Sequence, residues 1–131
     1  MVLEYQHVIK SDKDIYNIYQ SLGWLDYLNL NENQLALSMK QSFLVVYVYD
    51  EENLIATGRV VSDGIINAYI CGICVLEPYR KKGIGSNIVK LLVEACKKNN
   101  LHIQLVCEEH LIEYYQTLGF KKFASAMKYM D

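Results

Sequence analysis

A chain of 131 residues with 52% apolar and 21% charged side chains has the composition of a soluble globular protein, which excludes a disordered chain. Thirteen Lys and Arg against fifteen Asp and Glu give a net charge of -2, so the overall field attracts neither nucleic acid nor an anionic membrane. The apolar runs are far shorter than the roughly 20 residues of a membrane span, and the N-terminus is too polar for a signal peptide. We therefore expect one domain over residues 1–131, in the cytoplasm, without a nucleic-acid or membrane partner.

The hydrophobic pattern predicts a mixed order of strands and helices. Residues 1–9 read as a strand, 12–22 as a helix, and a second helix begins near Asn31, after a loop or partial turn. Three hairpin-connected strands follow, at 43–50, 54–61 and 66–76. A long helix (84–98), a strand (101–107), a short helix (111–118) and a final strand region (120–130) complete the chain. The predicted class is α+β (mixed α/β), in the order β-α-α-β-β-β-α-β-α-β, with a sheet that is part antiparallel and part parallel.

Four cysteines, at positions 71, 74, 96 and 107, lie among apolar residues, as is typical of reduced, buried thiols. A zinc site is the alternative, because Cys71-x-x-Cys74 and Cys107-x-x-His110 together supply three thiolates and one imidazole. Against it, residues three apart on a strand point to opposite faces. We expect no metal.

The most informative segment is EPYRKKGIGSN, residues 77–87, which joins an apolar strand to the long helix. Three cations are followed by two glycines at the start of the helix, where backbone N–H groups are unpaired and partly positive. The first acidic residue of this helix is Glu94, nearly three turns in, so the favourable negative charge is left to a ligand. The spacing matches neither a Walker loop nor the dinucleotide pattern G-x-G-x-x-G. A bound phosphate or pyrophosphate is predicted.

Arg80, Gly83 and Gly85 match the acyl-CoA pyrophosphate signature [Q/R]-x-x-G-x-[G/A] of the GNAT superfamily of N-acetyltransferases. The chain resembles this family further through ICVLEPYRKKGIGSNIVKLLVEACKK and the later YYQTLGF, so that the resemblance covers at least residues 43–130. It implies a bent mixed sheet whose fourth and fifth strands splay apart around acetyl-CoA. It also implies transfer of the acetyl group to the amine of a small acceptor, by direct attack in a ternary complex.

The resemblance also assigns cofactor-binding residues. The pantetheine arm would pair with the backbone of one strand, and the pyrophosphate would lie on the loop and the first helical turn. These residues are Ile73, Cys74 and Val75 for the arm, and Arg80, Lys81, Lys82, Gly83, Ile84, Gly85 and Ser86 for the pyrophosphate. Tyr115 corresponds to the family's tyrosine that protonates the CoA sulfur, with a purely packing role as the alternative. A backbone N–H between Ile73 and Val75 would stabilise the oxyanion.

The base that deprotonates the amine is left unassigned, because AYICGICV lacks the glutamate that many relatives carry there. Asp63, Glu108, Glu109 and His110 lie near predicted strand ends, either as bases acting through water or as surface residues. Glu108 stands where relatives often have Asn or Asp, seven residues before Tyr115, and would contact the pantetheine amide or recognise the amine.

The acceptor is expected beside the first two helices. Trp24 and Tyr27 would form an aromatic wall for a small amine, with core packing as the alternative for Trp24. The sequence does not identify the amine. An acyl-CoA-binding regulatory module with little catalysis is the alternative function, and pairing of a C-terminal edge strand with a second copy would give a homodimer.

Overall fold

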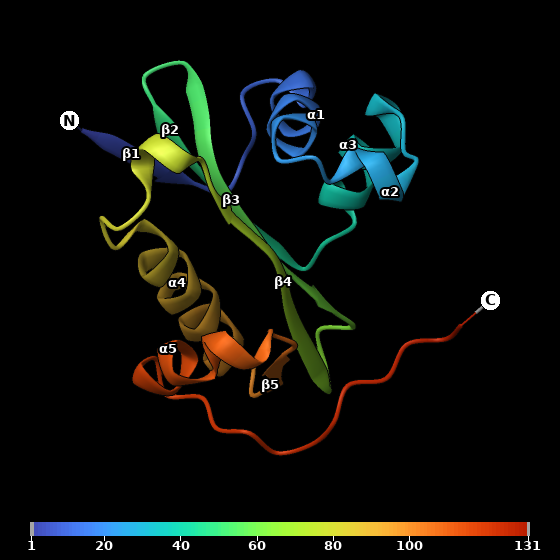
Figure 1. Ribbon diagram of the computed structural model, residues 1–131, viewed down its shortest axis with the longest axis vertical. Helices are drawn as coiled ribbons and strands as arrows, with labels where there is room; N and C mark the ends of the chain where they lie inside the picture. Colours follow the sequence, from blue (N-terminus) through green and yellow to red (C-terminus); the bar gives the residue numbers. More distant parts are fainter. Residues whose placement is uncertain (1, 131) are drawn as a thin grey trace.

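The computed structural model describes residues 2–130, and its centre is a mixed β-sheet with helices against both faces (Figure 1). Five strands lie side by side in chain order: β1 (Leu3–Gln6), β2 (Leu44–Asp50), β3 (Asn53–Ser62), β4 (Asn67–Val75) and β5 (His102–Leu105). The first four strands pair antiparallel, whereas β4 and β5 are parallel. This sheet confirms the predicted fold class.

The helices divide between the two faces of the sheet (Figure 1). One face carries α1 (Asp12–Ser21), α2 (Leu25–Leu28) and α3 (Glu32–Lys40), and the other carries α4 (Ile84–Lys98) with α5 (Ile112–Thr117) beside it. Short 3₁₀ turns, η1 (Glu77–Tyr79) and η2 (Glu109–Leu111), precede α4 and α5. The predicted helices are present, and α2 occupies the predicted partial turn. None of the helices within residues 2–130 has the length and apolarity that a membrane span requires.

Successive side chains of each strand point to opposite faces of the sheet, which separates two hydrophobic cores. On β2, Val46 faces one core, where it packs with α4 residues such as Ile88. Its neighbours Tyr47 and Tyr49 face the other core, with α1 and α3 residues such as Leu35. All five side chains are buried, so the sheet is covered on both sides over β2.

Helix α4 rests directly on β3 at Gly58. A Cβ atom at this position would lie 2.5 Å from Ile73 Cδ1 and 2.7 Å from Ile88 Cγ2, closer than van der Waals contact allows. Ile73 belongs to β4 and Ile88 to α4. The absence of a side chain at Gly58 therefore lets residues of both elements pack closely against β3 at this position.

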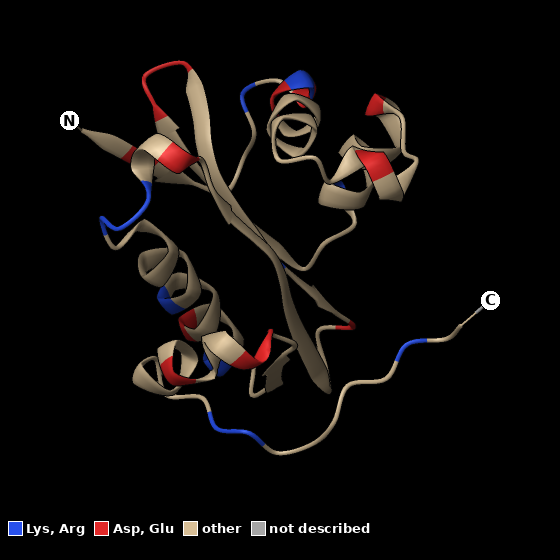
Figure 2. Cartoon of the chain, in the orientation of Figure 1, with Lys and Arg blue, Asp and Glu red and all other residues tan. Residues whose placement is uncertain are grey.

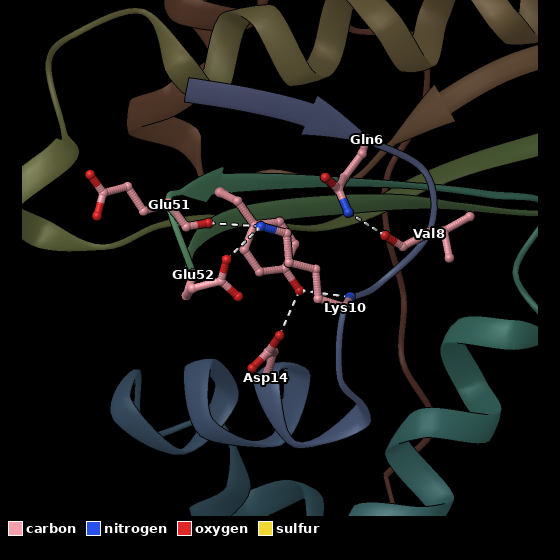
Figure 3. A network of polar contacts seen from close by, with 7 residues as sticks. Gln6, Val8, Lys10, Asp14, Glu51 and Glu52 are labelled. Carbon is pink, nitrogen blue, oxygen red and sulfur yellow. Dashed lines mark hydrogen bonds and ion pairs between the residues drawn. The ribbon is translucent and has the colours of Figure 1, made fainter. Parts of the chain in front are cut away.

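A buried tyrosine fastens α1 to the β2–β3 hairpin (Figure 3). The Tyr49 hydroxyl donates to Asp14 Oδ2 at 2.6 Å and accepts the Lys10 backbone N–H at 3.1 Å. The Lys10 ammonium lies 4.7 Å from the Tyr49 ring centroid and contacts the Glu51 carbonyl at 2.8 Å and Glu52 Oε1 at 3.5 Å. This network holds the N-terminal helices against the sheet.

The predicted final strand is wrong. After α5 the chain leaves the sheet as an irregular segment, and residues 121–130 are exposed (Figure 1). No segment within residues 2–130 pairs with the outer edge of β5. The sequence KKFASAM has lysines and small residues where a strand needs a bulky face to pack, so nothing local holds it in β conformation. The observed strand and helix order otherwise follows the prediction as far as α5.

Candidate active site

The candidate site is the wedge where β4 and β5 part. Their pairing ends at Ile70 and Leu105, and beyond this point β4 pairs only with β3. The separation begins beside a bulge at Gly72, whose φ of +66° is a left-handed conformation that favours glycine. The splay of the fourth and fifth strands agrees with the expectation.

A cleft of about 460 Å³ opens in this wedge. Its walls are residues 70–73 of β4, residues 105–108 in and after β5, and the side chains of Trp24, Leu111 and Tyr115. The cleft therefore brings together Ile73, Glu108, Tyr115 and Trp24, which the sequence placed in one site although up to 91 positions separate them along the chain.

The β4 residues beside the wedge turn their side chains into the protein. Ile73 and Val75 pack against the core under α4, and Cys74 lies in the core under α1. Burial raises the pKa of the Cys74 thiol to about 12, so this thiol is a neutral core group. What these residues offer a ligand is the backbone edge that β5 no longer covers.

At the upper end of β4, the helix α4 begins with free backbone donors. Gly83 is the N-cap, with a φ of +81°, and no side chain caps the helix. Its first turn contains no acidic residue. The N–H groups of residues 84–86 precede the first helical hydrogen bond, from Asn87 N–H to Gly83 O at 3.0 Å. Such a terminus is suited to an anion.

Three cations lie directly before this terminus, as the blue segment ahead of α4 in Figure 2 shows. Arg80, Lys81 and Lys82 are exposed. The Arg80 Nε–H donates to the Val75 carbonyl at 2.8 Å, which fastens the loop to the end of β4. Lys81 has a φ of +63°, a strained conformation for a residue with a side chain, so the surrounding loop holds its backbone in place.

Tyr115 lies on α5, with its ring half-buried against Tyr114 at 5.0 Å and Phe120 at 5.9 Å between centroids. Burial raises the pKa of the Tyr115 hydroxyl, to which no protein hydrogen bond contributes within the described chain. The neighbouring Tyr114 hydroxyl lies 2.9 Å from Ser86 Oγ, so α5 is joined to the first turn of α4. The Tyr115 hydroxyl thus lies in the cleft, on the helix that contacts the uncapped first turn of α4 through Tyr114.

A model of the acetyltransferase (GNAT) family matches residues 9–120. The chain belongs to the GNAT family. Members of this family are acetyltransferases, and GNAT acetyltransferases use acetyl-CoA. The sequence resemblance is confirmed, and it extends further toward the N-terminus than the segment from residue 43 that first indicated it.

Individual relatives agree on the fold. Histone acetyltransferase TAP1 of Glycine max is 23% identical over 131 residues, covering 91% of this chain and 57% of TAP1. The chain thus spans little more than half the length of this relative. A probable acetyltransferase from Staphylococcus aureus superposes with a TM-score of 0.81 at 20% identity, over 99% of both chains. A predicted acetyltransferase from Clostridium acetobutylicum, solved with acetyl-CoA, superposes with a TM-score of 0.71 at 17% identity, over 98% of this chain and 96% of that one.

Of the four candidate bases of this GNAT chain, Glu108 alone lines the cleft. Asp63 is exposed and accepts the backbone N–H groups of Ile65 and Ile66, both at 2.9 Å, which lowers the pKa of its carboxyl. Asp63 therefore shapes the β3–β4 turn. Glu109 is exposed, 3.8 Å from Lys122, and His110 is exposed outside the cleft walls.

The two aromatic residues predicted at the acceptor site lie in different surroundings in the structure. Trp24 lines the cleft and also packs edge-on against Tyr19, with 4.9 Å between ring centroids. Its packing role is therefore observed, and its role toward an acceptor stays a prediction. Tyr27 is 71% exposed on α2 and is absent from the cleft walls.

Sequence reasoning missed Tyr19 and Arg59. The Tyr19 hydroxyl lies 3.1 Å from the place a Cβ would take at Gly72, so it reaches the β4 bulge. Burial raises the pKa of Tyr19 to about 12, whereas the nearby Arg59 guanidinium opposes this rise. A signal for Arg59 was present in the sequence, because it is a lone charge inside the apolar strand LIATGRVV.

The zinc alternative receives no support from the described part of the chain, where no three metal-binding side chains cluster. Cys71 and Cys74 nevertheless do not point to opposite faces, contrary to the prediction. The Gly72 bulge pairs them with Arg59 and Thr57, which are two residues apart on β3, so both cysteines lie on the same face of β4. All four cysteines are unpaired.

Proposed function

We propose that this GNAT chain is an acetyl-CoA-dependent N-acetyltransferase that acetylates a small amine by direct attack in a ternary complex. The observation that carries this proposal is that a candidate anion site and a cleft lie at two ends of the same open strand edge. The uncapped terminus of α4 with its three cations leads along the open edge of β4 to a cleft that contains the Tyr115 hydroxyl.

The residues present fit acetyl-CoA. The amides of residues 81–86, with Arg80, Lys81 and Lys82, supply donors and positive charge for a pyrophosphate. A Cβ at Gly83 would meet no atom within 4 Å, so the loop is open to solvent on that side. The free backbone edge at Ile73, Cys74 and Val75 fits the amides of a pantetheine arm, which would extend the sheet like an added strand.

Different side chains of the cleft then carry out the two proton transfers of the reaction. Tyr115 is protonated at neutral pH, since burial raises the pKa of its hydroxyl further above the ordinary tyrosine value, and it donates that proton to the departing CoA thiolate. A backbone N–H between Ile73 and Val75 donates to the carbonyl oxygen as negative charge develops there. Glu108 accepts the proton of the attacking amine through water. Bound acetyl-CoA supplies the activated acetyl group.

An acyl-CoA-binding regulatory module remains the second candidate, and a specific observation favours it. β4 carries no acidic side chain, and Glu108 is exposed at the mouth of the cleft. The module would bind CoA as tightly as the enzyme, but thiol release from acetyl-CoA would be no faster than its hydrolysis without an amine.

The deciding experiment measures thiol release from acetyl-CoA with panels of alkylamines, polyamines, amino acids and aminosugars, together with calorimetric CoA binding. Amine-dependent turnover supports the enzyme. Tight CoA binding without turnover favours the module, and absence of CoA binding contradicts both proposals.

We also propose a cytoplasmic location and a homodimer. Four unpaired cysteines suit a reducing compartment. The outer edge of β5 lacks a strand partner within residues 2–130, which leaves it open to a second copy. Sedimentation equilibrium will report the oligomeric state, and a monomer at micromolar concentration would contradict the homodimer.

A further inference from the structure

Arg59 is a cation placed beside the cleft on the acceptor side of the sheet. It lies on β3 opposite Cys71, which lines the cleft. Its Cγ and Nε atoms are both 3.8 Å from the place a Cβ would take at Gly72, another residue of the cleft wall. The side chain therefore runs alongside the β4 bulge.

Within residues 2–130 the guanidinium has no carboxylate partner. The ion pairs found within residues 2–130 use Lys10, Lys40 and Lys122. Arg59 Nη1 donates to Ser42 Oγ at 3.1 Å, and the Tyr19 hydroxyl is its other polar neighbour. A guanidinium has five N–H donors, so these contacts leave several of them free.

The ionisable groups around Arg59 do not neutralise its charge. The residue is partly buried on β3, and the ionisable groups that it influences are Tyr19, Tyr47, Tyr69 and Cys71. Burial raises the pKa of each, so none of the four carries a balancing negative charge at physiological pH. Asp12 also acts on Tyr47, but its carboxylate lies 3.4 Å from the Lys40 ammonium. An anionic ligand would supply charge-assisted hydrogen bonds to the guanidinium.

A positive and a negative charge lie on different sides of the cleft, although Arg59 lies next to the wall residues Cys71 and Gly72 and is not itself a wall residue. Arg59 lies beside the β4 wall, whereas Glu108 lies in the wall that follows β5. A simple alkylamine or a polyamine, which enters as a cation, would be repelled on the Arg59 side. A molecule with both an amine and an anionic group would satisfy both sides.

We propose that the acceptor carries an anionic group, a carboxylate or a phosphate, and that Arg59 binds it. The inference rests on the function proposed above and narrows it from small amines in general to acidic amines. Arg59 is then a specificity residue, outside the proton transfers assigned to Tyr115 and Glu108.

The test compares acceptors in matched pairs that differ only in the anion: tyrosine with tyramine, and glucosamine 6-phosphate with glucosamine. Thiol release gives kcat/KM for each. We expect the preferred pair to show a ratio of about ten to a hundred in favour of the acidic member, the range for a charge-assisted hydrogen bond. If tyrosine is preferred over tyramine, the anionic group is a carboxylate. If glucosamine 6-phosphate is preferred over glucosamine, it is a phosphate.

Arg59→Met should bring this ratio close to one, and Arg59→Lys should retain part of it. Lys90→Met is the matched control, because it removes one exposed cation on α4 and changes the net charge equally, and it should keep the ratio. A preference for the members without the anionic group, or an equal loss for both members in Arg59→Met, would overturn the inference.

Calorimetric titration of the CoA-loaded protein with the same four amines separates the two proposals. Binding of an acidic amine that requires Arg59, without turnover, would contradict the proposed catalysis but support the role of Arg59. Turnover of amines with a ratio near one in the unaltered chain would support the catalysis and refute the role of Arg59.

Discussion

Replacing Gly85 by glutamate tests the proposed pyrophosphate site most directly. Gly85 lies in the first turn of α4, and a Cβ there would be 3.6 Å from the Tyr114 hydroxyl and 3.8 Å from Val75 Cγ2. Both are ordinary contacts, so Gly85→Ala fits without displacing a neighbour and serves as the control. Gly85→Glu adds a carboxylate at the amides that would hold the phosphates.

The magnitude follows from Coulomb's law. A carboxylate about 5 Å from a phosphate costs about 0.8 kcal/mol per pair of unit charges in water, and about 3 kcal/mol at an effective dielectric constant near 20. A pyrophosphate presents two such charges, so the loss of binding free energy is at least about 1.6 kcal/mol. This corresponds to a CoA affinity reduced more than about tenfold.

Isothermal calorimetry with CoA at two salt concentrations will measure the effect. The difference between Gly85→Glu and Gly85→Ala should shrink at high salt, because ions screen exposed charges. Equal affinities for the glutamate and alanine variants, with both folded by circular dichroism, would refute a pyrophosphate site at this helix terminus.

Three further predictions concern tyrosines. Tyr115→Phe should lower kcat by about a hundredfold, the low end for general acid catalysis, with little change in CoA affinity, as measured by thiol release and calorimetry. Tyr49→Phe should destabilise the fold by about 1.5 to 3 kcal/mol in urea unfolding, because Asp14 loses its 2.6 Å hydrogen bond. Stability should also fall as the pH rises from 10 to 12, because burial raises the pKa of Tyr19 and of Tyr47 to about 12 from 10.0. The folded state then binds more protons than the unfolded state in this window, so each group's contribution is complete below pH 10 and lost toward pH 12.

Exposed tyrosines provide the controls. Tyr27 is 71% exposed and Tyr129 is 89% exposed, so their phenylalanine variants should stay within about 0.5 kcal/mol of the parent and keep its kcat. An unchanged kcat in Tyr115→Phe would make that residue structural. A parental unfolding curve for Tyr49→Phe, or constant stability from pH 10 to 12, would contradict the corresponding prediction.

Local sequence signals predicted the elements whose formation depends on their own residues. The apolar stripe from Ile84 to Cys96 gave the bounds of α4, and the turn residues 50–53 placed the β2–β3 hairpin. The uncapped start of α4 was also predictable, since a helix start with glycines and cations and no acid is unusual by itself, whereas anion binding there stays a prediction. These features need no knowledge of distant contacts.

The remaining features depend on partners far away in the chain. The strand predicted over residues 120–130 does not form, because its lysines and small residues offer no bulky face and it pairs with none of the described strands. Tyr19 and Arg59 meet only because α1 packs over β3, and their 40-residue separation hides this in the sequence. The bulge at Gly72, which reverses the expected facing of Cys71 and Cys74, likewise depends on how β4 pairs with β3.

The contact at Gly58 has a consequence for engineering. Glycine-to-alanine exchange is a common route to a more stable protein, because it restricts the unfolded chain. At position 58 the added methyl group would instead collide with Ile73 and Ile88, at a cost of about 1 to 3 kcal/mol for an overfilled interior. A library selected only for thermal tolerance will therefore reject this exchange. A smaller residue at position 73 or 88 would make room for alanine at position 58, but it would also change how α4, whose N-terminus is the proposed phosphate site, packs on the sheet beside the cleft.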